Sequence, residues 1–352
     1  MDVMADQSPR GRVALALGSG GARGYAHIGV IDELTRRGYE IVGVAGSSMG
    51  ALVGGLHAAG KLDEFSEWAQ TLTQRAVLRL LDPSITAAGV LRAEKILDAV
   101  RDILGEVTIE ELPIPYTAVA TDLIAGKSVW LQRGAVDAAI RASIAIPGVI
   151  IPHVLDGRLL ADGGILDPLP LAPIAAVNAD LTIAISLSGP DPHANENTEA
   201  PEPGASTEWL SRLLRSTSAL LDTNTARTIL DTPAARSMLS RFGTSADSED
   251  GEDVVPSSAD QLVDSSREVP LPKLGSFAVM NRTIDIAQAA LARHQMAAYP
   301  PDLLIEVPRT ACRSLDFHRA AELIDLGHEL AAKALDGYRN MGPEIIITPE
   351  TP

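Results

Sequence analysis

The feature that most constrains the fold is a pair of short apolar segments, each followed at once by a glycine-containing turn and then by a helical pattern. The apolar segments are residues 13–17 and 41–45, and both have the length of a buried strand. The helical patterns cover 25–37 and 49–59. Strands that alternate with helices across short joints predict a parallel sheet with helices on both faces.

Similar patterns predict the organisation of the rest of the chain. Further helices are expected at 62–80, 93–104, 208–239, 278–296 and 317–338, and further strands at 116–120, 128–131, 159–162, 181–187 and 303–307. We expect a flexible N-terminus at 1–12, a core at 13–188 and a C-terminal part of the same domain at 273–345. The composition of 189–272 predicts an insertion that is partly helical and partly disordered.

Charge and composition exclude several classes of function. The formal net charge of −17 argues against nucleic acid as a partner, because phosphate binding needs clustered Lys and Arg. The one cysteine, Cys312, permits neither an intrachain disulfide nor a zinc site with several Cys ligands. Residues 1–12 lack the apolar core of a signal peptide, and the uncharged stretch 41–60 contains too much Gly and Ser for a membrane span. We therefore expect a cytoplasmic protein, with peripheral membrane contact left open.

The turn after the second strand has the pattern G-x-S-x-G, with Gly46, Ser48 and Gly50 at the fixed positions. Such a turn exposes a serine on a strained backbone, and the glycines remove side chains that would collide there. It also places Ser48 at the start of a helix, where free amides stabilise negative charge. We predict that Ser48 is a nucleophile, whereas Ser47 is off the nucleophile position.

The loop after the first strand is also rich in glycine. A dinucleotide-binding fingerprint would need glycine where Arg23 stands, so the loop is a poor match to that function. Small residues also let backbone amides point into a cleft, so Gly20 and Gly21 are candidates for an oxyanion hole. Arg23 either steadies this loop or adds positive charge near it.

A serine nucleophile needs a proton acceptor. His27 is the histidine nearest the glycine loop, but its setting favours a role in packing or in a polar network. Asp162 is a better candidate, because an apolar strand delivers it and Gly163 and Gly164 make a tight turn after it. Burial beside apolar strands would raise its pKa and make it a stronger base. Taken alone, however, Asp-Gly is a common turn pair.

Together these motifs resemble the patatin-like phospholipases, in particular bacterial proteins similar to the catalytic domain of neuropathy target esterase. The segments that carry the resemblance are 14–30, 45–53, 142–148 and 160–170. The likeness runs from about 13 to 187, with a looser similarity at 278–338. Ser19 departs from the family pattern, since many members have a third glycine there.

The resemblance implies a three-layer α/β/α fold and a serine hydrolase that cleaves acyl esters of phospholipids or lysophospholipids. It implies a Ser48–Asp162 dyad without histidine, an acyl-enzyme, and no metal or cofactor. Backbone amides of Gly20, Gly21 and Ala22 would hold the oxyanion. The supporting residues would be Arg23, Gly24, Gly46, Gly50, Gly163 and Gly164.

There are three alternatives to this interpretation. An ordinary α/β-hydrolase would need a histidine after the aspartate, and its G-x-S-x-G turn would come later in the chain. A lipid-binding module without catalysis is disfavoured because all candidate catalytic groups are present. An acyltransferase stays open, since an alcohol can capture an acyl-enzyme.

A helix carrying Trp209, Leu213, Leu214, Leu220 and Leu221 is a hypothetical lid or membrane contact, although a helix packed on the domain is the simpler interpretation.

Overall fold

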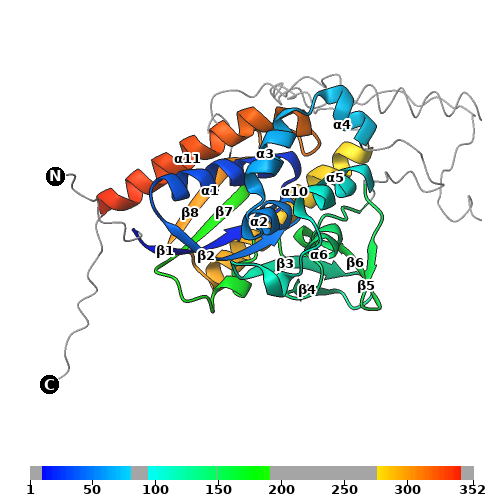
Figure 1. The fold of residues 1–352 in the computed structure, drawn as a ribbon, viewed down its shortest axis with the longest axis horizontal. Coiled ribbons are helices and arrows are strands. Elements are labelled where there is room, and N and C mark those ends of the chain that lie inside the picture. Colours follow the sequence, from blue (N-terminus) through cyan, green and yellow to red (C-terminus); the bar gives the residue numbers. More distant parts are fainter. Residues whose placement is uncertain (1–9, 81–93, 148, 191–275, 342–352) are drawn as a thin grey trace, which may run out of the picture. The chain divides into compact units, whose positions relative to one another are not determined.

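The computed structural model describes residues 10–80, 94–147, 149–190 and 276–341. These residues build one eight-stranded mixed sheet, in the order β5-β6-β3-β2-β1-β7-β8, with β4 also paired to β3 (Figure 1). The strands are β1 (Arg12–Leu17), β2 (Glu40–Ser47), β3 (Tyr116–Asp122), β4 (Lys127–Leu131), β5 (His153–Leu155), β6 (Arg158–Asp162), β7 (Leu181–Gly189) and β8 (Leu303–Pro308). Strands β3, β2, β1, β7 and β8 are parallel, which confirms the mainly parallel sheet.

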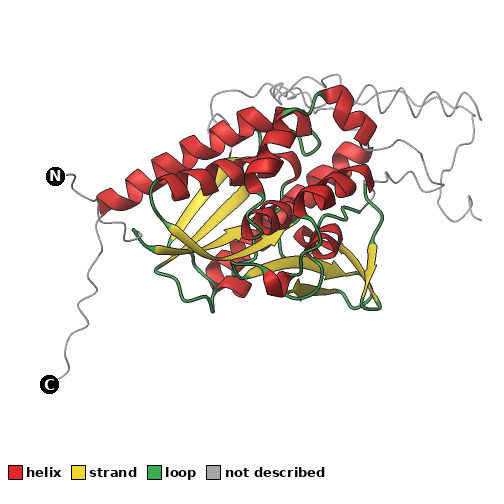
Figure 2. Cartoon of the chain, viewed as in Figure 1, coloured by secondary structure: helices red, strands yellow, loops and turns green. Residues whose placement is uncertain are grey.

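Helices cover the sheet, as Figure 2 shows. They are α1 (Ala26–Arg36), α2 (Met49–Ala58), α3 (Leu62–Gln70), α4 (Gln74–Leu80), α5 (Glu94–Leu104), α6 (Val136–Ser143), α10 (Ser276–Ala298) and α11 (Ala320–Met341). Short 3-10 helices are η1 (Gly21–Tyr25), η2 (Ile109–Glu111), η3 (Gly163–Ile165), η4 (Ala172–Ile174) and η6 (Phe317–Arg319). The arrangement confirms the predicted three-layer α/β/α fold.

The pleat of β1 explains the two layers of core. Leu15 and Leu17 belong to the large core, which they share with residues of α1, α2 and α11. Ala14 and Ala16 face the other way, into a smaller core that includes Ala292 of α10. Successive side chains of a strand point to opposite faces. An apolar run without alternation is therefore what a strand between two helical layers needs.

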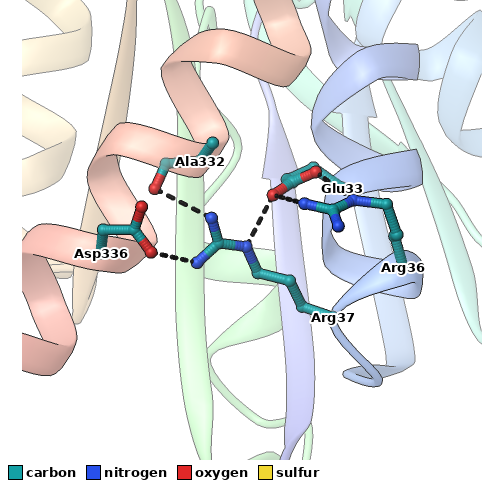
Figure 3. A network of polar contacts seen from close by, with 5 residues as sticks. All are labelled: Glu33, Arg36, Arg37, Ala332 and Asp336. Carbon is teal, nitrogen blue, oxygen red and sulfur yellow. Dashed lines mark hydrogen bonds and ion pairs between the residues drawn. The ribbon is translucent and has the colours of Figure 1, made fainter.

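An ion-pair network around the buried Glu33 joins α11 to α1 (Figure 3). The Arg37 guanidinium donates to Glu33 and to Asp336, both at 2.6 Å, and to the carbonyl of Ala332 at 3.3 Å. Arg36 makes two further hydrogen bonds to Glu33. Hydrogen bonds from Arg36 and Arg37 lower the pKa of the buried Glu33 carboxyl to about 2. The network fixes the C-terminal helix on the helix that follows the glycine loop.

Several sequence expectations change in detail. The single helix expected at 62–80 is wrong: α3 and α4 are separate, because Thr71 bonds to the Trp68 carbonyl and Thr73 accepts from the Ala76 amide at the start of α4. The sequence analysis also missed α6 and β5. The expected helix at 208–239 and almost all of the expected insertion lie outside the described residues, so the domain boundaries stay a prediction. In the part of the chain that the structure describes, no helix is long and apolar enough to cross a bilayer.

Candidate active site

Strands β2 and β6 meet head to head beside β3. Strand β2 runs parallel to β3 and ends at Ser47, opposite Val119. Strand β6 runs antiparallel to β3 and ends at Asp162, opposite Ala120. Because Val119 and Ala120 are neighbours, the two strand ends arrive at the same point from opposite directions. This register brings Ser48 and Asp162 together across 114 residues of sequence.

The backbone at Ser48 has the conformation that the G-x-S-x-G pattern predicts. Ser48 has φ of 56° and ψ of −122°, in a region that L-residues rarely adopt, and it stands directly before α2. A Cβ at Gly46 would lie 2.2 Å from the Gly50 carbonyl oxygen, and one at Gly50 would lie 2.1 Å from the Leu17 carbonyl oxygen. Only glycine fits at these two places, so the pattern follows from the tightness of the turn.

The Ser48 hydroxyl donates to Oδ2 of Asp162 at 2.5 Å. The other carboxylate oxygen accepts from the Gly164 amide at 2.7 Å, so the glycine turn holds the carboxylate in place. Burial raises the pKa of Asp162 from 3.8 to about 6, against the two hydrogen bonds that lower it. The result is a buried carboxylate, in contact with a buried serine, that is ionised at neutral pH and more basic than an ordinary aspartate.

Two side chains that the sequence analysis missed support this pair. The Ser143 hydroxyl, at the end of α6, accepts from the Ser48 amide at 2.9 Å and donates to the Val119 carbonyl at 2.6 Å. The Thr121 hydroxyl donates to the carbonyl of Asp162 at 3.0 Å. A buried serine or threonine has no sequence signal of its own, because its role depends on strand pairing.

The glycine loop lies against the same site. Gly21 and Ser48 line one pocket. The Arg23 side chain is buried, and its Nε donates to the carbonyl of Gly20 at 3.1 Å. Because the carbonyl and amide of a trans peptide point in opposite directions, holding this oxygen fixes the direction of the Gly21 amide. Of the two roles expected for Arg23, the geometry therefore favours steadying the loop.

The amides of this loop differ in their availability. The Ala22 amide donates to the carbonyl of Ser314 at 2.9 Å, so it is already engaged. The amides of Gly20 and Gly21 have no acceptor among the described residues. His27 is fully buried and its Nε2 contacts the Gly18 carbonyl at 2.9 Å, while burial lowers its pKa to about 4. His27 thus contributes a neutral imidazole that holds the glycine loop. This fits the expectation that His27 serves in packing or in a polar network.

The remaining glycines allow close contact between segments. A Cβ at Gly24 would lie 2.1 Å from Cγ of Met49, so the glycine loop packs directly on the residue that follows Ser48. A Cβ at Gly163 would lie 2.1 Å from the Val119 carbonyl oxygen, and one at Gly164 would lie 2.4 Å from the Ser19 hydroxyl oxygen. Because each of these positions is a glycine, two segments of the site can pack more closely there than a Cβ would allow.

Helix α10, late in the sequence, contacts both the glycine loop and the segment that follows Asp162. Asp285 forms an ion pair with Arg23 at 3.4 Å. Gln295 donates to the buried carboxylate of Asp167 at 2.7 Å, five residues beyond Asp162. Sequence spacing could not have found these contacts. Among the described residues, no group of three or more His, Cys, Asp or Glu side chains could hold a metal ion.

An apolar pocket extends from Ser48 into the helical layer. Its space amounts to about 760 Å³ including the open mouth, and among the described residues that line it Ser48 alone carries an aliphatic hydroxyl. The walls come from several helices and from the segment before β5, and include Leu52, Phe65, Trp68, Ile146, Val149 and Phe317. Such walls suit a hydrocarbon chain and offer little to a polar ligand.

The fold is of the patatin-like phospholipase class, and the sequence model of that family matches residues 15–175. An uncharacterized NTE family protein of Mycobacterium bovis is 66% identical over 343 residues, which cover 96% of this chain and 94% of that protein. The chain therefore belongs to the NTE family of patatin-like phospholipases and is a lipid ester hydrolase.

More distant relatives share only part of the chain. The neuropathy target esterase sws of Drosophila melanogaster is 32% identical over 186 residues, which cover 51% of this chain and 13% of that protein. Among solved structures, VipD from Legionella pneumophila aligns with a TM-score of 0.40 at 14% identity, over 93% of this chain and 67% of its own. That likeness is too distant to inform the function.

Proposed function

We propose that this protein hydrolyses acyl esters of phospholipids or lysophospholipids with Ser48 as nucleophile and Asp162 as the only general base. The observation that supports this proposal is the 2.5 Å hydrogen bond from the Ser48 hydroxyl to the Asp162 carboxylate. A nucleophile and its base must be within hydrogen-bond reach. Burial supplies the higher pKa that a proton acceptor at neutral pH needs.

The reaction would proceed through an acyl-enzyme. Ser48 Oγ attacks the ester carbonyl while its proton passes to Asp162, and the carbonyl oxygen becomes an oxyanion. The amides of Gly20 and Gly21, which have no acceptor among the described residues, would stabilise this charge. The oxyanion then collapses, the C–O bond breaks, and the leaving alcohol takes the proton from Asp162. Water attacks the acyl-enzyme, gives a proton to Asp162, and the fatty acid leaves as the proton returns to Ser48.

The apolar pocket supports a lipid acyl chain as the group that is transferred. The acyl chain would lie among Leu52, Phe65 and Trp68, while the alcohol part of the ester stays at the mouth beside Ser48. Burial of each methylene in such a pocket is worth about 0.8 kcal/mol. Esters with longer acyl chains should therefore react with higher kcat/KM, until the pocket is full.

The test is hydrolysis of soluble p-nitrophenyl esters and lysophospholipids, together with covalent labelling by a fluorophosphonate. Ser48→Ala should abolish labelling and activity, and Asp162→Asn should lower kcat by at least about a thousandfold. Full activity in either variant would refute the dyad.

Two matched controls separate chemistry from folding. Ser47→Ala removes the neighbouring buried hydroxyl, and Asp167→Asn removes another buried carboxylate whose pKa burial also raises to about 6. Neither group contacts Ser48, so both variants should keep most of the activity. A loss as large as that of the Ser48 and Asp162 variants would mean that the assay reports general damage to the core.

A further inference from the structure

Exposed apolar side chains gather at one corner of the sheet. Eight large apolar side chains are exposed among the described residues, and five lie between Leu123 and Val154. Ile124 is 81% exposed and Val154 is 65% exposed, and the others are Leu123, Trp130 and Ile151. Single exposed apolar residues are ordinary, but a concentration of them points to an interaction surface.

Strand register places three of them on one face of the sheet. Trp130 is opposite Val119, Val154 is opposite Leu159, and the Leu123 amide donates to the Leu159 carbonyl. Residues directly opposite in antiparallel strands share a face. Residues on this face of β1 and β2, such as Ala16 and Ala45, belong to the small core that includes Ala292 of α10. At the β3–β6 corner this face still buries Val119, Thr121 and Ala161, and it becomes exposed at Leu123, Trp130 and Val154.

The turn that presents Ile124 is held by hydrogen bonds to a buried carboxylate. The buried carboxylate of Asp122 accepts from the amides of Ile124 and Ala125, both at 2.9 Å. The acidic group is thereby directed into the protein and the apolar side chain stays outside. A preformed turn can insert its side chain without a further cost of ordering.

The charge of this corner is opposite to that of the whole protein. Residues 123–160 contain four of the 29 Lys and Arg residues but only two of the 46 Asp and Glu residues, in a chain of net charge −17. Lys127 and Arg158 are exposed on β4 and β6. Neither has an acidic partner within the described part of the chain. Lys127 is opposite Asp122 and Arg158 is opposite Leu155, so both basic side chains lie on the other face of the sheet from Trp130 and Val154. An anionic lipid surface that meets the two hairpin turns end-on contacts both the apolar and the basic side chains.

The corner also lies at the end of the sheet that carries Ser48. Strand β3 continues from Ala120, opposite Asp162, and reaches Leu123 after about 10 Å. Ile150 lines the apolar pocket, and Ile151, the next residue, is exposed. A lipid surface held at this corner thus lies at the same end of the sheet as Ser48, while most walls of the pocket belong to the core on the other face of the sheet.

We propose that Leu123, Ile124, Trp130 and Val154, with Lys127 and Arg158, form the surface by which the protein docks on an anionic lipid bilayer. We name these six residues the docking corner. The inference rests on the proposed function, since docking would bring lipid esters to the pocket. The apolar side chains enter the interface, and the two basic groups contact anionic headgroups.

The test is flotation of the full-length protein with vesicles of phosphatidylcholine alone or mixed with phosphatidylglycerol. The wild-type protein should bind the mixed vesicles, and raised salt should weaken that binding. Ile124→Asp combined with Val154→Asp should weaken it by at least about tenfold. Lys127→Glu combined with Arg158→Glu should remove the preference for phosphatidylglycerol. Ile286→Asp, at a 56% exposed position on α10, is the matched control and should bind like the wild type.

The outcomes separate docking from catalysis. Every variant should hydrolyse soluble p-nitrophenyl esters at the wild-type rate, which shows that the fold and site are intact. The docking proposal is overturned by wild-type protein that does not bind vesicles, by unchanged binding of the corner variants, or by an equal loss in Ile286→Asp. It is also overturned if a corner variant changes the mass of the protein in solution, because the corner would then be a contact between two copies. Failure to hydrolyse soluble esters would instead refute the proposed function.

Discussion

The Asp162→Asn variant should lose activity and gain stability. Burial raises the pKa of Asp162 from 3.8 to about 6. Because one pKa unit corresponds to about 1.4 kcal/mol, folding around the ionised carboxylate costs about 3 kcal/mol at neutral pH. Asparagine has nearly the same shape and carries no charge. Its oxygen can accept from the Gly164 amide and its nitrogen can donate to Ser48 Oγ, so both contacts are kept, with the direction of the Ser48 hydrogen bond reversed.

The pH dependence of this gain has a definite sign. The folded protein binds a proton at Asp162 below pH 6, whereas the unfolded chain does so only below about 3.8. The wild-type protein therefore loses stability at this site as the pH rises from about 4 to about 6. The advantage of Asp162→Asn should be near zero at the bottom of this range and should approach about 3 kcal/mol above it.

Urea unfolding of both proteins at several pH values measures this difference. Asp167→Asn is the control, because its carboxyl has a similarly raised pKa. It should show the same sign of stability change but keep its activity. The reasoning is refuted if Asp162→Asn is less stable than the wild type above pH 7, or if its advantage does not change with pH.

Three other predictions concern the pH profile and two ion pairs. In a pH-stat assay on a soluble ester, kcat/KM should fall about tenfold per pH unit below about 6, as Asp162 becomes protonated and cannot accept the serine proton; a flat profile from pH 4 to 8 would exclude it as the base. Glu33→Ala should lower the free energy of unfolding by about 2 kcal/mol in urea, since the mostly buried Arg37 then keeps only Asp336 and the Ala332 carbonyl as acceptors, whereas alanine at the exposed Arg36 should change it little. Asp285→Ala should lower kcat with little effect on stability, because Arg23 loses its carboxylate partner but stays hydrogen-bonded to the loop; an unchanged kcat would show that the ion pair does not position the loop.

The local parts of the site could be predicted from the sequence because their geometry is local. Gly46 and Gly50 collide with backbone if they carry a Cβ, so the pattern around Ser48 encodes its own turn. Asp162 was harder to assign, because an Asp-Gly pair is equally typical of an ordinary turn. What distinguishes it is the antiparallel pairing of β6 with β3, which no local pattern records.

The contacts between residues far apart in the sequence could not be predicted, for the same reason. Ser143 is the last residue of α6, a helix of only eight residues, which is too short for its apolar periodicity to identify it in the sequence. Asp285 and Gln295 come from a helix more than 100 residues beyond the site. Thr73 did carry a signal, since threonine often caps a helix, and the apolar periodicity of 62–80 obscured it.

The meeting of two strand ends beside Val119 and Ala120 limits where the length of this chain can change. One extra residue within β6 would move Asp162 by about 3.3 Å along β3 and turn its side chain to the opposite face of the sheet. The same insertion in the β3–β4 turn would leave the pair untouched. Engineered or natural length variants that retain hydrolysis should therefore have their insertions and deletions in the connections, never in these short strands.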